Sequence, residues 1–239
     1  MNQQSNKPGL VNWIGYLAIT LLLILPIAVL TVRSGAWQQG LMLYSLSCLA
    51  ASLLLLLSLV LLMLPRFATW RKAIGGRMLL TLPGTLLLLS VLARGGDYPP
   101  IHDITTDPGN PPVFTAAEQQ RGPKANTLDI NNDTITQQQK AYPDLKTIVT
   151  GLSLDETFDR ALQVATAMGW DIYHQDRNAG QIEAVDTTAI MAFKDDIVIR
   201  VHTNAQGTLL DLRSVSRVGV GDIGANAKRI RAFTQQFGQ

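Results

Sequence analysis

Two long stretches near the N-terminus carry no charged residue and consist mainly of aliphatic side chains. The first runs from Pro8 to Val32 and the second from Ser34 to Pro65. About 20 apolar residues cross the hydrocarbon core of a bilayer, and a charge at its centre costs roughly 2.5–3.5 kcal/mol. The pattern therefore predicts transmembrane helices over residues 10–32 and 41–64. A cleaved signal peptide is the alternative for the first stretch, but no small-residue cleavage site follows it.

A third apolar segment, residues 77–93, is shorter than the other two. Met78–Ala93 has 16 uncharged residues, which reach about 24 Å as a helix, less than the ~30 Å of the core. Residues 74–76 would complete a span if Arg77 extended its side chain to the interface. We expect a full span, with a re-entrant or interfacial helix as the alternative.

Basic residues predict the orientation of these helices. Arg66, Arg71, Lys72 and Arg77 lie between the second and third segments, and loops rich in Lys and Arg stay in the cytoplasm. The N-terminus, with Lys7, then lies on the same side. Three spans place the rest of the chain outside the inner membrane, which is the periplasm in a bacterium. If the third segment does not span, the rest stays in the cytoplasm.

The pattern changes after the apolar region. Residues 95–145 hold 7 of the 11 prolines, and their apolar positions have no period. This composition predicts a proline-rich connector that is partly ordered as a strap.

Regular periods return in residues 146–239. Lys146–Thr150 reads as a strand, and Ser153 with Glu156 forms a capping box before a helix that Gly169 ends. Asp222 is placed to cap a last helix. Four strands lie between the two helices, over Trp170–Gln175, Gly180–Thr187, Asp196–Thr203 and Thr208–Arg217. The order β-α-β-β-β-β-α predicts a small α+β domain with helices on one face of an antiparallel sheet.

One hairpin can be placed in register from the sequence. With the loop at 204–207, Thr203 faces Thr208, Arg200 faces Asp211 and Val198 faces Arg213. The alternate positions then collect the apolar residues on the other face, and a slip of one residue would turn them outward. We expect the charged face to be solvated, with cross-strand ion pairs.

Charge is distributed unevenly. Residues 1–94 hold 7 of the 20 Lys and Arg and none of the 18 Asp and Glu, so residues 95–239 carry 13 basic and 18 acidic side chains, a net charge of −5. This acidic part would repel a phosphate backbone, which excludes nucleic acid as a partner. Cys48 is the only cysteine, so an intramolecular disulfide is impossible.

Two motifs suggest chemistry that their context does not support. Residues 219–224 match G-x-G-x-x-G between a strand and a helix, but no later strand completes a dinucleotide fold, and Asp222 would face the pyrophosphate. A tight turn is the simpler interpretation, with an anion site that uses Arg217 as an alternative. His202 invites a hydrolase with Ser214 or Ser216, yet the register places it on the opposite face of the sheet, beyond hydrogen-bond reach.

Two clusters remain as candidate sites. His102, Asp103 and Asp107 form a His-Asp-x-x-x-Asp strap that could hold a divalent cation, although it lacks further ligands at metal-site spacing. Basic residues near the last helix could form one patch toward anionic headgroups or a partner. These are Lys228, Arg229 and Arg231, with Arg213 and Arg217.

Two stretches resemble one uncharacterised bacterial family, domain of unknown function 1499 (DUF1499). The first is Pro99–Asp107 with Asn110–Phe114; the second is Asp195-Asp196 with Arg213–Gly219, Asp222–Gly224, Asn226 and Arg229-Ile230. Many relatives carry an Asn-Cys-Val-Ser stretch after the connector, and this chain has no cysteine there. The resemblance implies a fold and no mechanism, and it implies that the set near the strand-to-helix turn matters to the domain.

We therefore expect a non-enzymatic inner-membrane protein whose periplasmic domain binds an envelope protein or an anionic ligand, in contact with membrane lipid and with no cofactor. The alternatives are a membrane-tethered metal-dependent enzyme that uses the strap, and a scaffold for a membrane complex. The candidate binding residues are Arg213, Ser214, Ser216, Arg217, Asp222, Asn226, Arg229, His102, Asp103 and Asp107.

Overall fold

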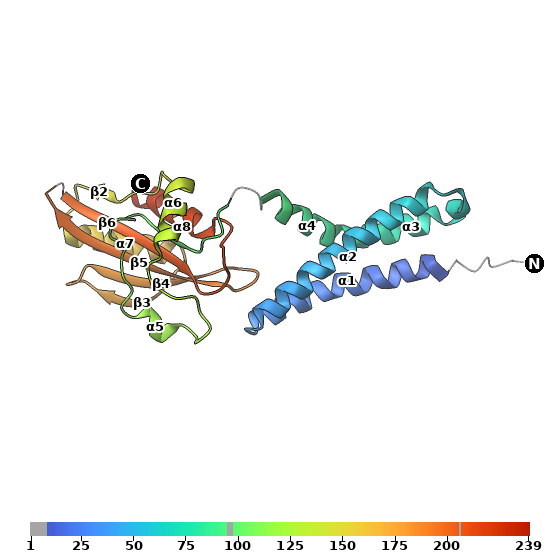
Figure 1. Cartoon of the computed structure of the whole chain (residues 1–239), viewed down its shortest axis with the longest axis horizontal. Coiled ribbons are helices and arrows are strands. Elements are labelled where there is room, and N and C mark those ends of the chain that lie inside the picture. Colours follow the sequence, from blue (N-terminus) through green and yellow to red (C-terminus); the bar gives the residue numbers. More distant parts are fainter. Residues whose placement is uncertain (1–8, 95–97, 206) are drawn as a thin grey trace, which may run out of the picture. The chain divides into compact units, whose positions relative to one another are not determined.

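The computed structural model describes residues 9–94, 98–205 and 207–239, so Lys7 lies outside the described residues. Contacts divide the chain into two compact units, residues 1–96 and 97–239. We call them the apolar unit and the sheet unit, and describe each by itself (Figure 1).

The apolar unit is helical apart from short connections at residues 34–36 and 64, within the residues described. It contains α1 (Gly9–Arg33), α2 (Trp37–Met63), η1 (Pro65–Trp70), α3 (Arg71–Met78), η2 (Leu79–Thr81) and α4 (Leu82–Arg94). Three helical stretches are long and apolar enough to cross a membrane: Gly9–Arg33, Trp37–Met63 and Pro65–Ala93. The third has 29 residues because η1, α3 and η2 precede α4, and these preceding helices carry Arg66, Arg71, Lys72 and Arg77. The helical stretch therefore begins before residue 77, where the sequence placed its start.

Close helix contacts and satisfied polar groups shape this unit. A Cβ on Gly84 would lie 2.8 Å from the Ala51 side chain, so the small residue brings α4 close to α2. Ser58 donates to the Leu54 carbonyl within its own helix. Arg77 does not reach outward; it donates to the Val11 carbonyl and to Asn12 Oδ1, at 3.0 Å for the latter, and so packs against the start of α1.

The sheet unit is built on six antiparallel strands. They are β1 (Asp103–Thr105), β2 (Ile148–Thr150), β3 (Asp171–Asp176), β4 (Gln181–Thr187), β5 (Lys194–Asn204) and β6 (Gly207–Ser216). The order is β1-β6-β5-β4-β3, and β2 pairs with the other end of β6. The long β5 and β6 strands run side by side across the unit (Figure 1). The predicted hairpin register is confirmed: Thr203 pairs with Thr208, Arg200 with Asp211 and Val198 with Arg213.

Two helices cover one face of this sheet, α7 (Leu154–Ala167) and α8 (Ala225–Phe237). The predicted capping box of Ser153 and Glu156 forms at the start of α7. The core between helices and sheet includes Phe158, Ile197 and Leu212, and the Trp170 and Phe233 rings stack at 5.5 Å. Burial of these side chains, each contributing about 1.5–3 kcal/mol, stabilises this layer.

The segment 98–145 supplies β1, α5 (Ala117–Gln120) and α6 (Asn132–Ala141) ahead of the predicted β-α-β-β-β-β-α order. Its residues 108–128 form the cover of the opposite face. Phe114 and Ala117 pack on Val198 and Val215 of the sheet. The expectation of a solvated charged face is therefore wrong: Glu183, Asp196, Asp211 and Arg213 are all buried beneath this cover.

Candidate functional site

Arg229 is the centre of a buried polar network between α8 and the sheet. Its guanidinium donates to Asp186 Oδ2 at 2.7 Å, to Asp195 Oδ2 at 2.5 Å and to Ser214 Oγ at 3.0 Å. It also donates to the Asn226 side chain. All its partners belong to this domain, so the network anchors α8 to β4, β5 and β6.

Asn226 completes that network. Its side-chain amide donates to Ser216 Oγ at 2.9 Å and to the His102 carbonyl at 3.0 Å, and it accepts from Ser214 Oγ at 2.7 Å. Asn226 thus joins α8 to β6 and to the residue that precedes β1. Four of the predicted site residues, Ser214, Ser216, Asn226 and Arg229, meet here as parts of the interior.

Asp222 holds the N-terminal end of α8, although Gly224 is the residue at the cap position. Its carboxylate accepts from the backbone N–H of Gly224 and of Asn226, each at 2.8 Å. Burial raises the pKa of Asp222, against the lowering effect of these two backbone hydrogen bonds. The chain's own carboxylate therefore occupies the amides that an anion site would need.

On the covered face, Arg213 pairs with Asp103 of β1. Nε donates to Asp103 Oδ1 at 2.9 Å and Nη2 to Asp103 Oδ2 at 2.7 Å, a bidentate geometry. The same guanidinium donates to the Leu128 carbonyl at 2.7 Å and lies over the Phe114 ring. Arg213 therefore ties the edge strand and the cover to β6.

Asp196 is a second buried anchor of the cover. It accepts from Arg217 through both oxygens, at 3.0 and 2.7 Å, and from Arg121 at 2.5 Å. Arg217 in turn donates to the Gln120 carbonyl at 2.8 Å. Burial lowers the pKa of Arg121, and the neighbouring Asp196 opposes that shift.

The Glu183 carboxylate binds the residues that precede α5. Its Oε1 accepts from the Thr115 N–H at 2.5 Å and from the Thr115 hydroxyl at 2.7 Å, and both oxygens lie 3.1 Å from the Ala116 N–H. Tyr173 donates to it from β3 at 3.4 Å, and burial raises the pKa of that phenol. Sequence periodicity gave no sign of this residue's role.

Asp211 and Arg200 form the remaining polar group on this face. Arg200 Nη2 donates to Asp211 Oδ2 at 2.8 Å, to Asp107 Oδ2 at 3.0 Å and to the Asn110 carbonyl at 3.0 Å. His202 Nδ1 lies 3.7 Å from Asp211 Oδ2. His202 belongs to the covered face and Ser214 to the α8 face, so the two cannot act together.

The strap residues have separate partners. The His102 ring lies 3.1 Å from the Val220 carbonyl, while Asp103 pairs with Arg213 and Asp107 with Arg200. Within residues 9–94, 98–205 and 207–239 there is no group of three His, Cys, Asp or Glu side chains that could hold a metal ion. The single basic patch does not form either, because Arg213 and Arg229 are buried on opposite faces of the sheet.

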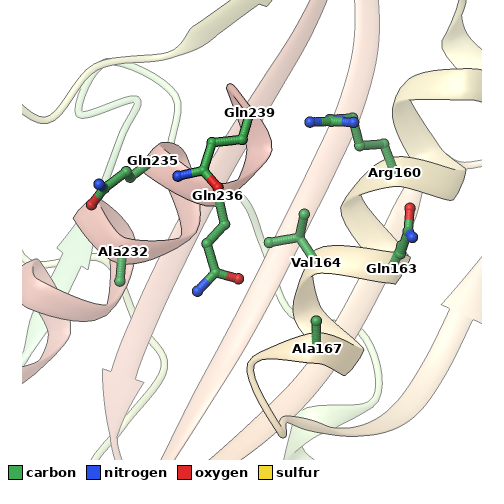
Figure 2. Close-up of a pocket in the computed structure, with 8 residues that line it drawn as sticks. All are labelled: Arg160, Gln163, Val164, Ala167, Ala232, Gln235, Gln236 and Gln239. Carbon is green, nitrogen blue, oxygen red and sulfur yellow. The ribbon is translucent and has the colours of Figure 1, made fainter.

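An open groove lies on the outer side of the α7–α8 layer, with a volume of about 520 Å³. Figure 2 shows its lining from both helices: Arg160, Gln163, Val164, Ala167, Ala232, Gln235, Gln236 and Gln239. Arg160 Nε donates to the Phe237 carbonyl at 2.6 Å, and its guanidinium lies over the Phe237 ring at 5.5 Å. These two contacts fix the guanidinium at one end of the groove.

The sequence gave two weak signals for this groove. Arg160, Gln163 and Ala167 recur at helical spacing on the polar stripe of their helix, and three glutamines cluster in the last five residues. Such polar stripes are ordinary on a solvated helix. Only the packing of α7 beside α8 shows that the two stripes face one gap.

The fold and its polar networks define an α+β domain that follows three apolar helices. The chain belongs to the family described as "Protein of unknown function (DUF1499)", which matches residues 103–237. The match begins at β1 and ends at the last residue of α8, so it includes the covering segment. No curated protein matches the chain.

Proposed function

We propose that this protein is a membrane-anchored binding protein of the bacterial envelope, and that its sheet unit binds an acidic peptide segment in the groove between α7 and α8. The proposal places the sheet unit in the periplasm, on the side opposite the basic segment 66–77. The proposed protein class, a binding module without a cofactor, is the one expected from the sequence. The proposed binding site consists of residues other than those that the sequence predicted.

The observation that carries the proposal is the orientation of Arg160. Phe237 holds this side chain through Nε and through its ring, and the guanidinium extends across the upper end of the groove (Figure 2). By contrast, Arg213, Arg217 and Arg229 are paired with carboxylates of the domain itself. Arg160 is thus an arginine positioned by its fold toward open space.

The lining chemistry suits a peptide with a carboxylate. A guanidinium recognises a carboxylate through parallel N–H donors. Glutamine amides both donate and accept, as Gln163 and Gln236 would do with a peptide backbone. Val164 and Ala167 leave room between the helices for a chain to lie.

A direct binding experiment tests this proposal. The full chain in lipid nanodiscs is titrated with a fluorescent acidic peptide and with the same peptide whose Glu residues are Gln. Arg160→Gln is expected to weaken binding of the acidic peptide about 10- to 100-fold, because hydrogen bonds to charged groups contribute about 1.5–3 kcal/mol.

Arg177→Gln is the matched control, because Arg177 also lies over a phenylalanine ring, that of Phe158, but lies outside the groove and pairs with carboxylates of α7. It should leave binding unchanged. Equal losses in the two variants, or equal affinity for the two peptides, would contradict the proposal.

A further inference from the structure

One end of the sheet unit carries exposed apolar residues on neighbouring loops. Asp195 at the start of β5 pairs with Ser216 at the end of β6, so the turn between β4 and β5 lies at the same end as the loop after β6 (Figure 1). The Arg217 N–H donates to the Lys194 carbonyl at 3.0 Å, which joins the two loops directly.

Three exposed side chains lie at this end, two on the loop 217–224 and one, Tyr98, on the segment before β1. Val220 is 77% exposed and Ile223 is 54% exposed. Tyr98, 43% exposed, lies against Gly224, where an added Cβ would come within 2.4 Å of its ring. The turn between β4 and β5 adds Ile190, 69% exposed. We call these four residues the apolar rim.

The loop that carries Val220 and Ile223 is held firmly in this outward form. Ile223 has φ +52°, a left-handed conformation that β-branched residues avoid. The Asp222 carboxylate accepts from the backbone N–H of Gly224, and the Asp222 N–H donates to the Ile101 carbonyl at 3.1 Å. The Val220 carbonyl lies 3.1 Å from the His102 ring. The strained backbone therefore points the charge inward and the aliphatic side chains outward.

The rim is joined to the third apolar stretch by a short length of chain. The third apolar stretch ends at Ala93, and four residue steps separate Arg94 from Tyr98. An extended chain covers at most about 14 Å in four steps. The first residue of the rim is therefore tethered at most about 14 Å from the end of α4.

We propose that the apolar rim inserts into the interfacial layer of the membrane that holds the apolar helices. Tyrosine suits that layer because its ring is apolar and its hydroxyl is polar. Lys194 and Lys228, exposed beside the two loops, suit anionic headgroups. The proposal does not depend on which side of the membrane the sheet unit occupies, nor on the groove.

Fluorescence quenching by lipids tests this directly. In the full chain with Cys48→Ser, reconstituted in vesicles that contain anionic lipid, Val220→Cys is labelled with an environment-sensitive fluorophore. Val149→Cys is the matched control: it is a valine, 55% exposed, on β2 at the opposite end of β6. We expect spin-labelled lipids to quench the label at 220 several-fold more than the label at 149.

Ile190→Cys provides a second, independent position, since it lies on the other loop and a misfolded Val220 variant would not affect it. It should be quenched like position 220. Equal quenching at 190, 220 and 149 would overturn the proposal. So would a blue-shifted but unquenched label at 220, because that result would indicate a protein partner or a second copy of the chain.

Discussion

Arg213 shows how much of this domain depends on buried charge. Its partner Asp103 lies 110 residues away in the sequence, and the pair is enclosed by the cover. An ion pair that is removed from water gives little net stability as a pair, but loss of one member leaves a buried charge without compensation. The pair therefore determines that β1 and the cover must dock for the sheet to be stable.

We expect Arg213→Met to lower the free energy of unfolding of the sheet unit by about 3–5 kcal/mol. The double variant with Asp103→Asn should cost less than the sum of the two single variants, because the two groups interact directly. Pulse proteolysis of the full chain in urea measures each value.

Arg231→Met is the matched control for that cycle. Arg231 pairs with Asp144 through two hydrogen bonds, but both side chains are about half exposed. Exposed pairs contribute about 0–1 kcal/mol. A loss at Arg231 as large as that at Arg213 would show that burial is not the cause.

At this scale, the sequence predicted some neighbours and missed others. The facing of Arg200 with Asp211 followed from the period of two, because one register alone buries Ile197 and Leu212. The partners of Arg213 could not follow in the same way. Asp103 lies in a segment without a period, and nothing local indicates that this segment adds a strand beside β6.

Among the elements, the turn between β3 and β4 depends on one glycine. Gly180 has φ +65°, and a Cβ there would lie 2.0 Å from the Val201 carbonyl oxygen. The Val201 N–H donates to the Gly180 carbonyl at 2.7 Å, so the turn is fixed against β5. Both the backbone conformation and the close approach require the absence of a side chain.

Gly180→Ala should therefore lower the free energy of unfolding by more than about 2 kcal/mol, because the left-handed conformation alone costs roughly 1–2 kcal/mol. Gly151→Ala is the control, since nothing lies within 4 Å of its Cβ position, and it should change stability by less than about 0.5 kcal/mol. Thermal unfolding of the full chain, followed by protease sensitivity, compares them. Similar melting of the two variants would show that the turn adapts.

Elements with strong local signals were predictable, and those without them were not. The capping box and the helical period placed α7, and alternation placed β4, β5 and β6. β1 has three residues and α5 has four, which is too short for a period to appear. Their positions are set by Arg213 and Glu183, side chains of strands that come later in the chain.

For the whole molecule, charge along the sequence favours one orientation. The region 65–81, between the second apolar helix and α4, holds four basic residues and no acidic one. Arg77 contacts Val11 and Asn12, so this region lies at the same end of the apolar unit as the start of α1. The orientation proposed above places one span, the third, between this region and the sheet unit.

In the Cys48→Ser background, a cysteine at Gln137 should react with a membrane-impermeant maleimide in intact spheroplasts, because α6 lies in the sheet unit and Gln137 is exposed. A cysteine at Thr69, also exposed, should react only after lysis. The reverse pattern would place the sheet unit in the cytoplasm.

The entry of the chain through β1 has a mechanical consequence. A pull from a bound ligand is transmitted along the covalent chain, which joins the sheet at three residue pairs between β1 and β6. The hydrogen bonds of Ile101 and His102, that short ladder and the Asp103–Arg213 contact bear the load first. Rupture of these contacts would detach the cover and expose the buried charged side chains beneath it to water, so tension would disrupt the edge of the domain before its core.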